Sequence, residues 1–263
     1  MSNAASDEVL IAVVLRLIAG ARHVAVGANS PIPAAAAFLA RHLSPEAPAV
    51  SLQQSPEHNL WTDGGRELFD SAGQGRIDVF FFSGAQIDGA GNINLNVIGD
   101  YAHPKARFPG AYGSAYLYFM VPRIILFRLE HSRRTLVDKV DFVSAPGTSP
   151  PNVFRRGGPV ALVTPLCHFA FDQARARFRL ESVHPGHSLE EVLDNTGFAF
   201  DRGDAVPQTP APSWELLALL RGTVAAQVAA IYPKFAERVW GIPMSGIERV
   251  ASPHPSLPLT GAT

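Results

Sequence analysis

The sequence predicts an α/β fold with helices flanking a sheet, because short apolar runs alternate with helical patterns. Residues 23–26 form a predicted strand, Gly27 opens a turn, and residues 32–42 continue as an alanine-rich helix. A strand, a glycine-containing turn and a helix within about twenty residues make a βα unit. Further apolar runs carry the β-branched and aromatic residues of buried strands, at residues 49–52, 77–82 and 123–127.

The second half of the chain predicts an antiparallel portion of the sheet. Residues 160–164, 169–172 and 178–183 read as three strands in succession. Residues 140–143 are expected to add another strand. The charged stretch at residues 129–139 is expected to be a solvated connection.

Helices are expected where capping residues precede an apolar stripe. The first begins at residues 6–8, where acidic groups suit a helix N-terminus, and ends near Gly20. Shorter helices are expected at residues 66–71, at 114–120 and after Ser188, and a longer one at 214–231. We assign residues 1–205 to one α/β domain. Residues 206–263 form a C-terminal helix and an irregular tail packed on that domain.

Composition excludes several classes of function. The net charge is −1 and the sequence pI is near 6.8, so no electrostatic footprint for nucleic acid or an anionic membrane is expected. No run of about 18 uninterrupted apolar residues predicts a membrane span. The single cysteine, Cys167, fits a reducing compartment, and we expect a cytoplasmic protein. The histidines show no spacing typical of a metal site.

The stretch at residues 80–113 carries the strongest sign of function. It joins a buried strand end to a glycine-rich turn, a row of asparagines and a basic, proline-marked loop. Strand ends are where open α/β sheets bind ligands. A hairpin with a glycine-rich loop explains the same residues, so the local chemistry leaves both interpretations open.

Four strings in this order resemble the B subunits of family I coenzyme A transferases, in particular the glutaconate CoA-transferase type. They are GAQIDGAGNINLNVIGDY, HPKARFPG, VDKVDFVSAPG and VHPGHSLEEVLDNTGF. The resemblance implies an open α/β fold with a mostly parallel sheet. It also implies an A subunit as partner, in a heterodimer or heterotetramer, with the active site between the subunits. A homo-oligomer is the alternative if the chain assembles without that partner.

The resemblance further implies a coenzyme A thioester as substrate and no permanently bound cofactor. In the family reaction a B-subunit glutamate attacks the acyl-CoA, gives a mixed anhydride and then a glutamyl-CoA thioester. A carboxylate serves as nucleophile and then as leaving group. This chain has Gln54 at the position of that glutamate, and an amide cannot form the anhydride. Glu57 offers a carboxylate three residues later; its alternative is a surface loop residue.

The glycine loop also departs from the family pattern. Gly110 and Gly113 persist, whereas Tyr112 and Tyr116 replace a glycine and an aspartate. Glycine-rich backbone permits the close approach that an oxyanion site needs. The two tyrosines are therefore expected to add bulk where the family keeps room for the thioester.

Other residues are candidates for binding the substrate or coenzyme A. The resemblance places Gly84, Ala85, Gln86, Asn92 and Asn94 near the pocket. For the asparagines, capping of loop backbone is the alternative. Lys105 and Arg107 are candidates for the phosphates of coenzyme A, with plain solvation as the alternative.

Two classes of function remain from the sequence. The first is an enzyme subunit, acting in CoA transfer or in hydrolysis of an acyl-CoA, as some two-subunit proteins of this fold do. The second is a non-catalytic subunit that binds CoA esters or stabilises its partner.

Overall fold

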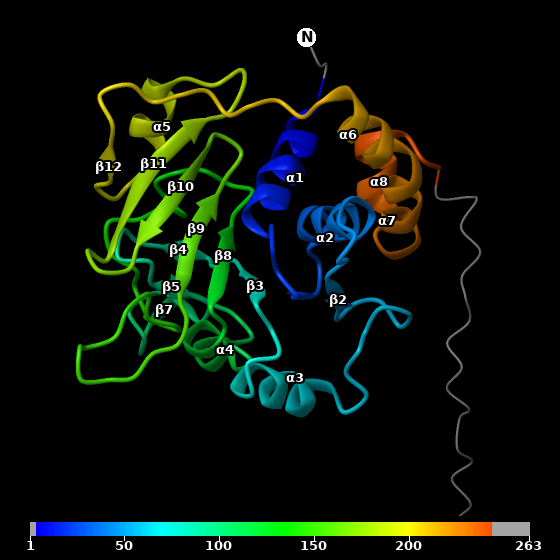
Figure 1. Cartoon of the computed structure of the whole chain (residues 1–263). Helices are drawn as coiled ribbons and strands as arrows, with labels where there is room; N and C mark the ends of the chain where they lie inside the picture. Colours follow the sequence, from blue (N-terminus) through cyan, green and yellow to red (C-terminus); the bar gives the residue numbers. More distant parts are fainter. Residues whose placement is uncertain (1–3, 244–263) are drawn as a thin grey trace, which may run out of the picture.

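The computed structural model describes residues 4–243, and Figure 1 shows one sheet with helices on both faces. Eight strands lie in the order β12-β11-β10-β9-β8-β3-β1-β2. Their bounds are β1 His23–Val26, β2 Ala49–Leu52, β3 Val79–Phe82, β8 Arg123–Phe127, β9 Pro159–Val163, β10 Cys167–Asp172, β11 Arg177–Val183 and β12 Asp201–Arg202.

The sheet is mostly parallel, as the resemblance implied. β1 pairs in parallel with β2 and β3, and β3, β8 and β9 continue in the same direction. β10 is antiparallel to both β9 and β11, which confirms the antiparallel portion in the second half. Two small hairpins stand apart from this sheet: β4 Gln86–Ile87 with β5 Ile93–Asn94, and β6 Val97–Gly99 with β7 Pro104–Arg107.

Successive strand residues point to opposite faces of the sheet, and each face is covered by its own helices. Phe81 of β3 faces a core with α1 Ser6–Leu17, α2 Pro31–Leu43 and the C-terminal helices. Phe80, its neighbour, faces a second core with α3 Gly64–Gly73, α4 Ser114–Met120 and α5 Leu189–Asn195. The two cores fix which side chains reach the strand ends.

A long C-terminal helix packs on α1 and α2 (Figure 1). It runs as α6 Trp214–Leu219, a π-helical turn η1 Leu220–Val224 and α7 Ala225–Ile231. By length and composition this helix could cross a membrane; here Leu217, Leu220 and Val224 are buried in the core that contains α1 and α2. The sequence did not predict the following helix, α8 Pro233–Trp240. Most of the expected irregular tail lies outside the described residues.

Two expectations about residues 129–143 are wrong. Within the expected solvated connection, Thr135 and Leu136 are only 2% and 0% exposed, because Leu136 forms a bridge to Ile87 of β4. Residues 140–143 form no strand. A side chain, and not a neighbouring strand, accepts the backbone hydrogen bond there: the Asp141 N–H donates to Oε1 of Gln86 at 2.9 Å.

The C-terminal helices are tied to α1 by a buried carboxylate. Glu8 is 1% exposed and accepts two hydrogen bonds of 2.7 Å from Arg221 of η1. It also accepts one from the Trp240 indole at 3.3 Å. Burial raises the pKa of Glu8, but the hydrogen bonds from Arg221, the Ala5 N–H and Trp240, together with the charge of Arg221, hold the pKa below its ordinary value. The carboxylate is therefore ionised and needs its arginine.

Replacing Arg221 by leucine is expected to destabilise the fold by about 3 kcal/mol, because it leaves a buried charge unpaired. Arg238→Leu is the matched control, since Arg238 of α8 also pairs with α1, but its partner Asp7 is 14% exposed whereas Glu8 is 1% exposed. That more exposed pair should contribute about 1 kcal/mol or less. Urea unfolding of both variants measures the difference, and equal losses would contradict the anchoring role of Glu8.

Three histidines, the buried His184 and the half-buried His131 and His168, are held in the neutral form. Burial lowers the pKa of His131, His168 and His184 to about 4. His131 accepts or donates hydrogen bonds with Thr164 and Thr196, at 2.7 and 2.9 Å. Such groups resist protonation in the folded chain, whereas the unfolded chain protonates them near pH 6.5.

Stability is therefore expected to fall as the pH drops from about 6.5 towards 4, and the histidine contribution should level off below that. Each histidine should cost up to about 2 kcal/mol at pH 5. Carboxylates with lowered pKa lose their contribution only below about pH 4.5, so the two effects occupy different windows. Urea unfolding between pH 7 and 5 measures the slope, and His184→Gln should reduce it by about a third. An unchanged slope would show that these rings are not the cause.

Candidate functional site

Four neighbouring parallel strands end at the same edge of the sheet and bring together residues far apart in the sequence. In the strand order β2-β1-β3-β8, the residues just beyond the strand ends are Gln54, Asn29, Ser83 and Arg128. Adjacent strands are about 4.8 Å apart, so this row spans roughly 14 Å. In an open α/β sheet, the carboxyl edge is the ligand-binding edge.

A cleft of about 920 Å³ opens at this edge beside β3 and β8. That volume is typical of a small-molecule site. Its walls are largely apolar, with backbone from residues 83–86 on one side and arginines on another. The lining residues are Ser83, Gly84, Ala85, Gln86, Leu95, Ile98, Ala106, Phe108, Pro109, Gly110, Arg128, Arg133, Arg134, Thr135 and Val137.

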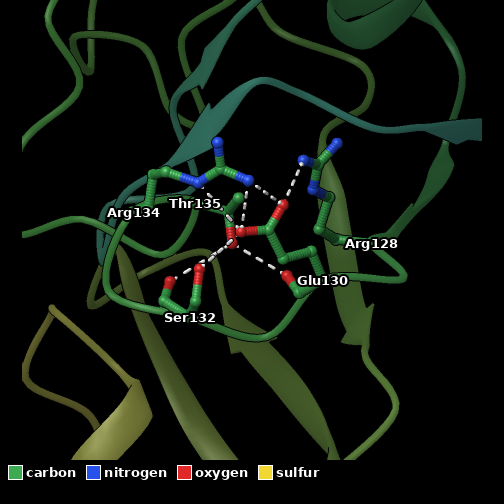
Figure 2. A network of polar contacts seen from close by, with 5 residues as sticks. All are labelled: Arg128, Glu130, Ser132, Arg134 and Thr135. Carbon is green, nitrogen blue, oxygen red and sulfur yellow. Dashed lines mark hydrogen bonds and ion pairs between the residues drawn. The ribbon is translucent and has the colours of Figure 1, made fainter.

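The arginine wall, formed by Arg128, Arg133 and Arg134, is organised around one carboxylate, as Figure 2 shows. Glu130 lies between two guanidinium groups and accepts hydrogen bonds from Arg128 at 3.2 Å and Arg134 at 2.9 Å. Ser132 donates to the same carboxylate at 2.8 Å. The Ser132 hydrogen bond and then the two arginines hold the pKa of Glu130 below its ordinary value. One anion thus orients two cations, and the wall keeps a positive charge.

The third arginine of the wall is held differently. Arg133 donates to the Asp194 carbonyl at 2.6 Å and to the Leu193 carbonyl at 3.3 Å, at the C-terminal end of α5. With three arginines and one glutamate, the wall suits an anionic group of a ligand.

The resemblance-derived position Gln54 lies at the β2 end of the row. Its Oε1 accepts the Asn29 backbone N–H at 2.7 Å, which ties the β2 loop to the β1 loop. Its side-chain NH₂ group remains as a donor on an exposed residue. Glu57 is exposed in the following turn and lines neither this cleft nor the smaller pocket next to it.

The glycine loop divides between the cleft and α3. Gly110 lines the cleft. Tyr112 and Tyr116 instead contact Phe69 of α3, with ring centroids 5.8 and 5.9 Å apart. Gly113 has φ +64°, and a Cβ there would lie 2.4 Å from the Phe69 ring. The tyrosine rings therefore pack against α3 and do not line the cleft.

Lys105 and Arg107 lie on β7, on either side of Ala106. Ala106 lines the cleft, so the alternation of a strand turns its two basic neighbours to the opposite face. Arg107 stacks over the Tyr101 ring at 4.9 Å and donates to the Tyr101 carbonyl at 2.8 Å. These two residues do not share a surface with the arginine wall.

The asparagine-containing strings form a buried scaffold beneath the cleft. Asn94 is fully buried; its amide donates to Gln86 at 2.8 Å and to the Val97 carbonyl at 2.6 Å. Gln86 in turn donates to Asp141 at 3.0 Å. Asn92 donates to Asp88 at 3.0 Å and accepts the Gly147 N–H at 3.0 Å. These contacts favour the scaffold alternative for both asparagines.

Gly84 is required by the same scaffold. A Cβ at this position would lie 2.7 Å from the Gln86 carbonyl oxygen, which no side chain can tolerate. Gly84 thus presents backbone without a side chain to the cleft, as an approach by substrate requires, while the neighbouring Ala85 N–H already donates to the Asn94 carbonyl at 2.8 Å.

Sequence reasoning missed the arginine wall and Ser83. The pattern of residues 129–139 indicates a solvated connection because several charged side chains lie close together there. The available signal was position: Arg128 directly follows a buried strand, at the edge where the other candidates gather. Within residues 4–243 no cluster of three or more histidine, cysteine or acidic side chains could hold a metal ion. Burial also raises the pKa of the Cys167 thiol, so Cys167 is a structural residue.

The fold and this edge define an α/β protein with an arginine-lined cleft at the carboxyl ends of parallel strands. The profile of the family described as "Coenzyme A transferase" matches residues 43–195. The chain belongs to this family.

Relatives of known activity agree with that assignment. The chain is 39% identical over 162 residues to the B subunit of the 3-oxoadipate CoA-transferase of Pseudomonas knackmussii, covering 59% of this chain and 62% of the relative. It is 37% identical over 150 residues to the B subunit of the glutaconate CoA-transferase of Acidaminococcus fermentans, covering 54% and 55%. The alignments thus span less than two thirds of either relative.

Two further proteins that this chain resembles are named for other activities. The chain is 29% identical over 191 residues to "Cholesterol ring-cleaving hydrolase IpdB subunit" of Mycobacterium tuberculosis, covering 68% of this chain and 72% of the relative. A chain of the decarboxylase AibA/AibB superposes with a TM-score of 0.71 at 26% identity, covering 91% of this chain and 100% of the other.

Asn94→Ala is expected to destabilise the fold by about 3 kcal/mol, because it leaves buried partners on Gln86 and Val97 unsatisfied. Lys105→Ala, at an exposed position of the neighbouring hairpin, should change stability by less than about 0.5 kcal/mol. Chemical denaturation of both variants compares them. If Asn94→Ala were as stable as Lys105→Ala, Asn94 would be free for a role in binding.

Proposed function

We propose that this chain is the B-type subunit of a two-subunit enzyme that processes coenzyme A thioesters. The observation that carries the proposal is the cleft at the carboxyl edge, with bare backbone on one wall and three arginines on another, in a chain of this family. An acyl-CoA offers both a thioester for the backbone wall and anionic groups for the arginines. Coenzyme A enters as a substrate and not as a resident cofactor.

The partner is an A-type subunit, in a heterodimer or heterotetramer. The cleft is open along one side, and the position of the family glutamate carries an amide. The ionised Glu130 is held by two arginines and a serine, which makes it a weak nucleophile. A carboxylate supplied by a second subunit would complete the site. The buried thiol and the near-neutral net charge fit a cytoplasmic location for the complex.

Two reactions fit this arrangement. CoA transfer is the activity of the relatives at 39% and 37% identity. Hydrolysis is the second candidate, because a relative at 29% identity is a hydrolase subunit and because Gln54 can orient a water molecule but cannot form an anhydride. A non-catalytic subunit that binds CoA esters is the outcome if neither reaction occurs.

The test is to co-express the chain with an A-type subunit of the same family from the same organism and to assay a panel of acyl-CoAs. Turnover only in the presence of an acceptor acid identifies transfer; release of free coenzyme A without an acceptor identifies hydrolysis. Light scattering of the purified complex gives its stoichiometry. If a stable complex forms and turns over no CoA ester, the enzymatic proposal is wrong.

Gln54→Glu is expected to raise transferase activity at least about tenfold, because it restores a carboxylate that can form the anhydride and thioester. Hydride reduction during turnover should then trap a glutamyl-CoA adduct at residue 54, detectable by mass spectrometry. Gln53→Glu is the matched control, because it places the same new charge one residue earlier, away from the Asn29 hydrogen bond. An adduct in the control, or none in Gln54→Glu, would place the nucleophile elsewhere.

A further inference from the structure

A second, smaller pocket lies on the other face of the same sheet edge. It has a volume of about 200 Å³ and shares Ser83 and Arg128 with the large cleft. Its remaining walls include Asn29, Ile32, Phe127 and Leu129. The two pockets therefore meet across the carboxyl ends of β3 and β8, one on the α2 face and one on the hairpin face.

Topology marks this pocket as a ligand site independently of its shape. β1 has β2 on one side and β3 on the other. The connection from β1 through α2 therefore leads to one side of β1, and the connection from β2 through α3 leads back past β1 to the other side. The crevice outside such a switch point is where open α/β sheets bind ligands. Asn29 follows β1 and Ser83 follows β3, and both line the pocket.

The chemistry of the pocket excludes the usual occupant of such a crevice. A helix N-terminus there normally binds phosphate through its free N–H groups. α2 begins with Pro31, and Pro33 follows two residues later, so two of its first three residues have no N–H to donate. The Ser30 hydroxyl already donates to the Ala28 carbonyl at 3.1 Å. The walls beyond are Ile32, Phe127 and Leu129, which favour an apolar group.

We propose that this pocket is the acyl subsite, which takes the apolar part of the acyl group of the CoA thioester. The anionic parts of the substrate then lie along the arginine wall of the large cleft. The inference rests on the proposed function. It also follows from the position of Gln54, whose Oε1 accepts the N–H of the pocket residue Asn29 at 2.7 Å. Gln54 itself lines neither the cleft nor this pocket, and the bond to Asn29 places its loop beside the pocket.

The volume sets the class of acyl group. The pocket volume of about 200 Å³ is below the roughly 300–1,000 Å³ of sites that bury a drug-sized ligand. A short hydrocarbon chain or a single small ring fits this space, whereas a long fatty acyl chain does not. Leu129 is 55% exposed, which places it at the mouth where substitutions change size without disturbing the core.

The experiment measures acyl selectivity in the complex of this chain with its A-type subunit. Leu129→Trp should lower the ratio of kcat/KM for hexanoyl-CoA to that for acetyl-CoA by about tenfold, since it fills the mouth. Leu129→Ala should raise the ratio of kcat/KM for a bulkier ester, such as benzoyl-CoA, to kcat/KM for acetyl-CoA. Leu43→Trp is the matched control at 52% exposure, at the far end of α2, and should leave both ratios unchanged. An unchanged ratio in Leu129→Trp overturns the proposal.

A binding measurement separates this inference from the proposed function. Saturation-transfer NMR on the full chain alone should show hexanoate binding that is lost in Leu129→Trp and kept in Leu43→Trp. If the complex turns over no CoA ester while this binding pattern holds, the proposed function fails, and the pocket remains a binding site for a short apolar group without a role as acyl subsite. Hexanoate binding that is equal in both variants, or absent from the unaltered chain, overturns the pocket assignment.

Discussion

The parallel pairing of β1 with strands on both of its sides is the constraint on which the site depends. Because β2 and β3 both run in the direction of β1, their carboxyl ends meet at one edge, and the loops that follow them cannot avoid one another. Gln54, Asn29 and Ser83 are 25 to 54 residues apart in the sequence and become neighbours for this reason alone. The sheet, and no local motif, assembles the candidate site.

Buried polar side chains hold the loops at this edge in place. Burying these groups costs free energy, which their hydrogen bonds have to offset. Asp88, Asn94 and Asp141 each accept or donate bonds that replace regular ladder pairing in the segments around the cleft. Buried polar groups are costly unless they are paired, and here the loops are held in one arrangement because each group finds its partner. The backbone of Gly84, which has no side chain, borders the cleft as a consequence.

The alternation of strands and helices made most of the fold predictable. Periodicity and capping predicted β1, β2, β8 and α4 within a residue or so. They failed at residues 129–143, where a charged segment is partly buried because its arginines share one carboxylate and Leu136 pairs with Ile87. Such a pairing joins residues about fifty positions apart, and local pattern carries no trace of it. The sequence made Lys105 and Arg107 candidates for phosphate because both are basic residues in a predicted loop. In the structure they lie on β7 on either side of Ala106, and the alternation of side chains along that strand turns them away from the cleft.

Under the proposal that Gln54 holds the position of the family glutamate, an amide in place of a carboxylate changes one property of the site and preserves another. The Oε1 atom of Gln54 accepts the Asn29 N–H, and a glutamate oxygen could accept the same bond, so the loop needs no rearrangement in either case. The two side chains differ in their second polar atom: glutamine has the NH₂ nitrogen, which donates hydrogen bonds, where glutamate has a second anionic oxygen, which accepts them. A donor at the end of the row can stabilise a developing oxyanion or orient water, but it cannot attack a thioester. On the proposed function, the carboxylate nucleophile therefore has to come from outside the row that the parallel strands assemble.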